Sequence, residues 1–210
     1  DLYDNLEIDS ILFGSRICRF TREGHAFFVD LGKTIEAGDL ETIGVWYHGK
    51  PVVSENPPWD GGFVWEKDSL GRDWVGVACE GAGASLWWPN KDHLSDEPDS
   101  MRITLEAPES LMAVSNGQLT GRKPAPEQYR QWTWEISYPI NNYNVTLNLG
   151  HYRPFSDLYI SEGDSMELRY YVLDYNLDKA KEHFKQVVGM LRCYEDLLGK
   201  FPFWEDGFAM

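Results

Sequence analysis

The sequence predicts a mostly β protein, an antiparallel β-sandwich followed by one long C-terminal α-helix. Three observations lead to this fold class. Apolar and polar residues alternate in short runs up to residue 173, turn-forming residues separate these runs, and the apolar spacing then changes from two to three and four. Many short strands without helices between them favour antiparallel sheets that pack face to face.

The strand assignments rest on alternation. In YNVTLNL (143–149) the apolar residues fall at every second position, as expected where one sheet face is buried and the other is wet. The same pattern occurs in TIGVWYH (42–48), MRITLEA (101–107) and WTWEI (132–136). AFFVDL (26–31) is more continuously apolar, which predicts a strand covered on both faces.

The helix is predicted from Leu177 to Leu198, where apolar residues recur at three and four and form one stripe. Asn176 is placed to cap its start, and Gly199 followed by Pro202 is a stop signal. The pattern therefore predicts a single helix of about six turns.

Composition limits the possible partners. The chain has 210 residues, of which 42% are hydrophobic and 14% aromatic, enough for a proper core. Its net charge of −15 comes from acids scattered along the chain. Since binding to phosphates needs clustered Lys and Arg, we expect no nucleic acid and no anionic membrane as partner. Three cysteines without CxxC spacing are expected to be free thiols.

Catalytic motifs are not found in the sequence. No HExxH pair, GxSxG elbow, phosphate-binding loop or dinucleotide fingerprint occurs, so no catalytic residue is predicted in this chain. The segment KDHLSDEPD is the one candidate for a cation site, through Asp92, Asp96, Glu97 and Asp99. The alternative is a solvated loop in which Asp or Ser caps a turn.

Glu80 is the candidate binding residue. It ends the strand-like run WVGVACE and is followed by Gly81, Ala82, Gly83 and Ala84, which have no long side chains. Space beside a carboxylate suits a bound cation, such as a free α-amine held by a charge-assisted hydrogen bond. The alternative is an ordinary surface acid at a strand end.

Tryptophans offer a second candidate surface. Trp87, Trp88, Trp132 and Trp134 could form a platform on which a sugar stacks. Trp132 and Trp134, however, lie two apart on one strand with Ile136, the arrangement expected of core residues.

Several segments together resemble a known family. CEGAGASLWWP, SDEPDSMRITLEAPESLMAVSNGQL, PINNYNVTLNLGHY and the stretch from LDYNLDKA to FPFWEDG are similar to the N-terminal domain, and the start of the catalytic domain, of the aminopeptidase N family of gluzincin zinc metallopeptidases. The insert NKDHLS between Pro89 and the DEP triplet departs from the family pattern.

The resemblance implies a division of the chain. Residues 1–173 would be a saddle-like β-sandwich whose first strands are missing, and 174–210 the first helix and start of a truncated catalytic domain. Glu80 would bind the α-amine of a peptide substrate. Zinc would belong to the intact protein, so this chain is expected to hold no cofactor and to be inactive alone, with the substrate N-terminus and its own catalytic domain as partners. Two alternatives are a stand-alone carbohydrate-binding module and a scaffold domain of a homologue that lacks zinc.

Overall fold

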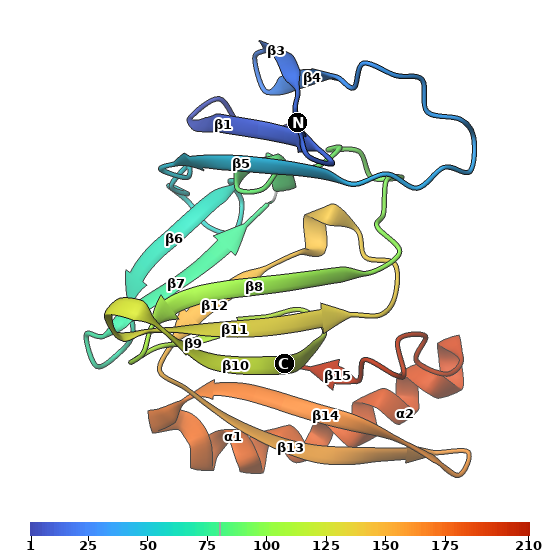
Figure 1. Ribbon diagram of the computed structural model, residues 1–210. Helices are drawn as coiled ribbons and strands as arrows, with labels where there is room; N and C mark the ends of the chain where they lie inside the picture. Colours follow the sequence, from blue (N-terminus) through green and yellow to red (C-terminus); the bar gives the residue numbers. More distant parts are fainter. Residues whose placement is uncertain (80) are drawn as a thin grey trace. The chain divides into compact units, whose positions relative to one another are not determined.

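The computed structural model describes residues 1–79 and 81–210, and it is mostly β (Figure 1). Its strands are β1 Leu6–Phe13, β2 Arg16–Ile17, β3 Arg19–Glu23, β4 Ala26–Asp30, β5 Ile43–Gly49, β6 Gly62–Lys67, β7 Asp73–Ala78, β8 Met101–Pro108, β9 Met112–Ser115, β10 Gln118–Ala125, β11 Tyr129–Ile136, β12 Leu147–Gly150, β13 Tyr152–Ser161, β14 Asp164–Leu173 and β15 Phe208–Ala209. The helices are α1 Leu177–His183 and α2 Val187–Leu198, with 3₁₀ turns η1 Ala84–Leu86, η2 Pro126–Gln128, η3 Asn142–Asn144, η4 Asp174–Asn176 and η5 Phe184–Gln186. The predicted class, mostly β with antiparallel sheets, is confirmed.

The chain divides into two compact units, which are described separately. Unit 1 comprises Asp1–Val64, Val77–Glu97 and Asn141–Asn144, and unit 2 comprises Trp65–Gly76, Pro98–Ile140 and Val145–Met210. The predicted boundary between residues 173 and 174 stays a prediction. No helix formed by the described residues has the length and apolar character needed to cross a bilayer.

Unit 1 is built on the antiparallel sheet β2-β1-β5 and the hairpin β3-β4. Leu2, Leu6 and Ile11 are buried, and the Arg22 guanidinium donates to the Leu6 carbonyl at 2.7 Å. AFFVDL does form β4, but its predicted coverage on both faces is wrong, because Phe28 is 57% exposed. β3 and β4 form a sheet of only two strands, and its face at Phe28 is open although the strand is rich in apolar residues.

Unit 2 contains the antiparallel sheet β10-β11-β8, in which β11 pairs with both neighbours. Along β11 the side chains of Trp132, Trp134 and Ile136 are buried, which confirms the core prediction for this strand. The Trp134 indole is fully buried, and its Nε1 donates to the Ala113 carbonyl at 3.1 Å. This bond satisfies the one polar atom of the ring, as burial requires.

The predicted strand at 143–149 is only partly correct. Strand starts at Leu147 with β12, while Asn142–Asn144 form the turn η3. The Asn141 Oδ1 accepts a hydrogen bond from the Tyr143 N–H at 2.9 Å. Such a side-chain acceptor competes with strand pairing, and alternation in the sequence does not reveal it.

The prediction of one long C-terminal helix is wrong. The segment forms α1 and α2, separated by the 3₁₀ turn η5. Phe184, the first residue of η5, stacks on Tyr170 with ring centroids 5.0 Å apart. Apolar residues recur at three and four positions in an α-helix and across a short 3₁₀ turn alike. The spacing in the sequence therefore did not reveal the switch from α-helical to 3₁₀ hydrogen bonding at η5. The stop at Gly199 is confirmed by its φ of 90°, whereas Asn176 precedes α1 without a side-chain cap.

The helices pack on the β13–β14 hairpin within unit 2. Val187 and Leu191 of the helical segment join Tyr159, Met166 and Leu168 in a buried cluster. A polar contact borders this cluster, since the Glu195 carboxylate accepts hydrogen bonds from the hydroxyls of Tyr159 and Ser161. Apolar contact and this polar contact together dock α2 on the sheet.

An ion-pair network fixes the loop between β6 and β7. The Arg72 guanidinium binds the Asp174 carboxylate through two bonds of 2.8 and 2.6 Å, and its Nε binds Asp68 at 2.8 Å. Hydrogen bonding to Arg72 lowers the pKa of Asp174 to about 2. The loop is thereby tied to η4, just before α1.

We predict that the docking of α2 depends on Leu191. Leu191→Ala should lower the free energy of unfolding by about 2–5 kcal/mol, because it opens a cavity at a side chain that is 4% exposed. Leu198→Ala is the matched control, since Leu198 is 82% exposed and should change stability by less than about 0.5 kcal/mol. Urea denaturation measures both, and equal effects would contradict this docking.

We also predict an acid-dependent loss of stability at Asp174. The pKa of Asp174 is lowered to about 2 in the folded state. Its ion pair therefore contributes to the free energy of unfolding at pH values above the unfolded-state pKa of about 3.9. That contribution is lost as the pH falls through the folded value. Asp174→Asn should therefore destabilise the protein at neutral pH, and its difference from wild type should shrink between about pH 4 and pH 2. Denaturation at a series of pH values checks this, and a difference that does not vary with pH would count against it.

Candidate functional site

The predicted site falls in unit 1, at the turn after β7. Glu80 itself lies outside the described residues. The residues on both sides are described: Cys79 is buried, and the N–H groups of Ala82 and Gly83 donate to its carbonyl at 3.2 and 3.0 Å. Ala82 and Gly83 are thus hydrogen-bonded to Cys79 before the chain enters η1.

The glycines of the predicted small-residue run have different roles. Gly81 and Gly83 have φ of 69° and 84°, a region that side chains disfavour. A Cβ at Gly81 would meet open space, whereas one at Gly83 would lie 1.9 Å from Asp92 Oδ2. Asp92 also accepts a hydrogen bond from Ser85 Oγ at 2.8 Å. A carboxylate of the acidic loop therefore packs directly against the turn.

A cavity of about 370 Å³ adjoins this turn within unit 1. It is lined by Tyr3, Val52, Trp59, Asp60, Gly61, Gly81, Ala82 and Leu86. The Tyr3 hydroxyl donates a hydrogen bond to the Ala82 carbonyl at 3.1 Å. The Trp59 residue is 76% exposed. Aromatic and aliphatic walls beside a turn of small residues can accept an apolar group of a ligand.

Asp60 is the only acid among the described residues that line this cavity. The Ser54 hydroxyl donates to Asp60 Oδ1 at 2.6 Å, and the N–H groups of Glu55 and Asn56 donate at 2.7 and 2.8 Å. These bonds, led by the one from Ser54, lower the pKa of Asp60. The carboxylate is charged but already engaged, so it fixes the loop that carries Trp59.

The sequence did not predict that Tyr3 and Trp59 form part of the cavity wall. The segment NPPWDGG (56–62) predicts a turn, and nothing in its pattern predicts that it lies beside residues 81–82. The feature that could have indicated this site is Trp59 itself. A large aromatic residue in a loop rich in Pro and Gly is not expected to be there for core packing, so it can mark a binding surface.

Cys79 is not a nucleophile candidate. Burial raises the pKa of its thiol to about 11. The side chain packs with Ala84 and Leu86 in a small apolar cluster. A thiol in this setting stays protonated at neutral pH and serves as a core residue.

The acidic loop is held by two amide side chains. Asn142 Nδ2 donates to the carbonyls of Lys91 and Asp96 at 3.1 and 3.0 Å, and Asn141 Nδ2 donates to that of Leu94 at 3.1 Å. Among residues 1–79 and 81–210, no group of three or more His, Cys, Asp or Glu side chains could hold a metal ion. The geometry therefore gives the cation interpretation of this loop no support.

The tryptophans do not form the platform that sugar stacking needs. Trp132 and Trp134 are buried on β11. Trp87 and Trp88 are half-buried and meet edge to face, with an angle of 67° between their rings. A sugar platform requires exposed faces, so core packing is the better description of these residues.

Comparison with known proteins gives a likeness in structure but not in sequence. No protein-family model matches the chain. No curated protein matches it either. Among solved structures, an M1 zinc metallopeptidase mutant from Deinococcus radiodurans bound to a Tyr-Ser-Ala substrate is similar, with a TM-score of 0.78 and 18% identity over 97% of this chain. The same peptidase without the mutation gives 0.77 and 17%.

A second similar structure is Legionella pneumophila aminopeptidase A in complex with aspartic acid, with a TM-score of 0.70 and 17% identity over 96% of this chain. The chain spans less than half of these proteins, 46% of the first and 23% of the second. At this level of identity, the likeness shows that the chain has the fold of the corresponding part of M1 metallopeptidases.

We predict that the turn tolerates a side chain at Gly81 better than at Gly83. Both alanine substitutions require an unfavourable positive φ, which costs about 1–2 kcal/mol. Gly83→Ala must also displace Asp92 and break its bond to Ser85, so it should lower the free energy of unfolding by about 1–3 kcal/mol more. Denaturation of the two variants measures the difference, and equal losses would contradict the contact with Asp92.

Proposed function

We propose that this chain is the N-terminal β-rich domain, with the start of the catalytic domain, of a zinc-dependent aminopeptidase that removes N-terminal residues from peptides. The observation that carries the proposal is the likeness to the M1 metallopeptidase fold over 97% of the chain. The similarity of CEGAGASLWWP and the segments after it to the aminopeptidase N family supports it independently. In this proposal, residues 1–173 form the β domain and 174–210 begin the catalytic domain.

The role proposed for the β domain is to shape the substrate pocket and to bind the α-amine through Glu80. A carboxylate forms charge-assisted hydrogen bonds with a protonated amine, and it discriminates against a blocked N-terminus. The cavity against Gly81 and Ala82 supports this role, because it leaves room beside the turn. Its walls, which include Val52 and Leu86, suit an apolar group.

Zinc belongs, in this proposal, to the rest of the intact protein. The sequence has no HExxH pair, and its described residues form no cluster that fits a zinc ion. The part of this chain in the reaction is therefore binding and orientation, with the bond-breaking groups supplied elsewhere. An alternative within the same fold is a scaffold domain whose parent protein has lost its zinc site. The carbohydrate-binding alternative is disfavoured by the burial of Trp132 and Trp134.

We predict that Glu80 contributes to catalysis in the intact protein. Glu80→Ala should reduce transition-state stabilisation for an aminoacyl-anilide by about 2–4 kcal/mol, because it leaves a substrate ammonium unpaired. This corresponds to a fall in kcat/KM of about 30- to 1000-fold. Steady-state kinetics with purified variants checks the prediction.

Glu97→Ala is the matched control, since Glu97 is an exposed acid of the same unit, and it should stay within about twofold of wild type. An unchanged kcat/KM in Glu80→Ala would remove the amine-binding role. The 210-residue chain alone, assayed with added zinc, should show no turnover. Turnover by the isolated chain would overturn the assignment as a non-catalytic domain.

A further inference from the structure

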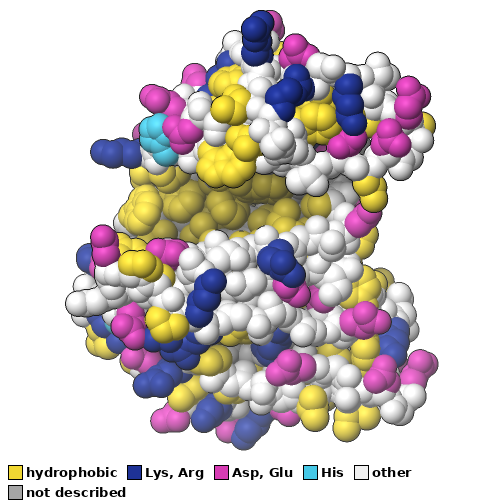
Figure 2. Space-filling model, viewed as in Figure 1, with side chains coloured by type: hydrophobic (Ala, Val, Ile, Leu, Met, Phe, Trp, Pro, Cys, Tyr) yellow, Lys and Arg dark blue, Asp and Glu magenta, His cyan; other side chains and the backbone are white. Residues whose placement is uncertain are grey.

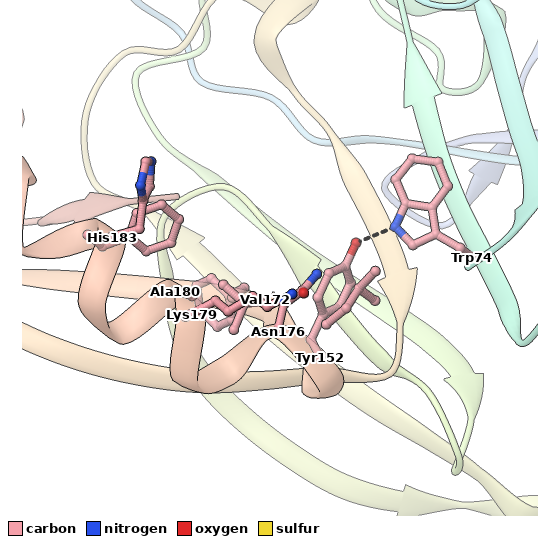
Figure 3. A pocket seen from close by; sticks show the side chains of 10 residues that line it. Trp74, Tyr152, Val172, Asn176, Lys179, Ala180 and His183 are labelled. Carbon is pink, nitrogen blue, oxygen red and sulfur yellow. Dashed lines mark hydrogen bonds between the residues drawn. The ribbon is translucent and has the colours of Figure 1, made fainter. Parts of the chain in front are cut away.

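Unit 2 contains a second cavity, of about 520 Å³, at the beginning of α1 (Figure 3). Its walls come from the side chain of Trp74 on β7, from Tyr152 on β13, from the end of β14 and from one side of α1. All of the residues that line the cavity belong to unit 2. The amine-binding role proposed for Glu80 uses none of them, so this site stands independently of the proposed function.

The aromatic wall of the cavity is fixed by a hydrogen bond. Trp74 Nε1 donates to the Tyr152 hydroxyl oxygen at 2.8 Å, as the dashed line in Figure 3 marks. Burial raises the pKa of Tyr152, so the hydroxyl keeps its proton at neutral pH. Among the described residues this O–H has no acceptor. It is therefore available to donate a hydrogen bond to a ligand.

The α1 side of the cavity offers donors and a cation. Asn176, Lys179 and His183 recur at three and four positions and so lie on one side of the helix, as Figure 3 shows. The Asn176 amide does not cap the helix. Within the described part of the chain, the Lys179 ammonium has neither an ion-pair nor a hydrogen-bond partner. His183 contacts Gln186 at 2.9 Å through Nε2.

The charge at this cavity is opposite to that of the whole chain. The chain carries a net charge of −15, yet none of the described residues that line the cavity is an Asp or Glu. In Figure 2, by contrast, acidic side chains lie among basic ones over much of the face shown. A cavity with an unpaired ammonium and free donors favours an anion, and its aromatic wall favours an apolar body.

We propose that this cavity binds a small organic carboxylate with an aromatic or other apolar body. The carboxylate pairs with Lys179 and accepts hydrogen bonds from Asn176 and from the Tyr152 hydroxyl, while the body packs on the rings of Trp74 and Tyr152. One lysine, without an arginine beside it, suits the single charge of a carboxylate better than a phosphate group. The size of the cavity is within the usual range for small ligands.

The test is a calorimetric titration of the full chain with 3-phenylpropionate. We expect a Kd of about 1 mM or tighter, given the size of the probe. The uncharged analogue 3-phenylpropanamide should bind at least about tenfold more weakly, because it cannot pair with Lys179. Equal binding of the two compounds, preference for phenyl phosphate, or no binding of 3-phenylpropionate at several times that concentration would each overturn the proposal.

Variants connect the binding to this cavity. Lys179→Glu should abolish detectable binding, whereas Lys181→Glu makes the same charge change on α1 outside the cavity and should leave Kd within about twofold. Tyr152→Phe retains the ring, removes the donor and should weaken binding by about 2- to 10-fold. Loss of binding in Lys181→Glu, or normal binding in both Lys179→Glu and Tyr152→Phe, would place the ligand elsewhere and contradict the proposal.

Discussion

The turn after β7 depends on the absence of a side chain at Gly83. The carboxylate of Asp92 occupies the space that a Cβ would need, and it accepts a hydrogen bond from Ser85 Oγ. This contact joins the small-residue run to the acidic loop that follows the two tryptophans. The adjoining cavity, with its wall at Gly81 and Ala82, depends on the path that the turn takes. Small residues here permit close packing of backbone against a polar side chain, and they also leave open space nearby.

In unit 2, stacked aromatic side chains determine how the helices pack on the β13–β14 hairpin. Phe184 stacks on Tyr170, and Tyr170 stacks on Phe155, with centroids 5.0 and 4.7 Å apart. Large flat side chains between a hairpin and a helix bring much apolar area into contact. The interruption of the helix at Phe184 lies within this stack. The cavity at the beginning of α1 lies next to the same elements, so it is a product of how the helices dock on the hairpin.

Fold and function are separate conclusions for this chain. The likeness to M1 metallopeptidases extends over nearly the whole chain, and it describes the backbone. A shared fold supports many activities, because function depends on the residues at a site. Both proposals made for this chain are therefore about recognition. In one, a carboxylate binds an ammonium group, and in the other, an ammonium group binds a carboxylate.

The sequence by itself determined the element types and much of the core. Alternation placed Trp132, Trp134 and Ile136 on the buried side of β11, and the three-and-four spacing placed Val187 and Leu191 on one apolar stripe, which the structure shows buried against the hairpin. Local patterns report these features because a side chain's direction follows from the period of its own element. The prediction for Glu80 rests on the small residues that follow it in the sequence, and it stays a prediction because the residue lies outside the described part of the chain.

Only the tertiary structure decided where distant segments meet. It placed Trp59 and Tyr3 beside the turn at 81–82, brought Asp92 onto Gly83, and changed the helix to a 3₁₀ turn where Phe184 meets Tyr170. It also left Phe28 exposed on a two-stranded hairpin, although its segment is rich in apolar residues. Each of these outcomes depends on contacts between residues far apart in the chain, which no local period encodes.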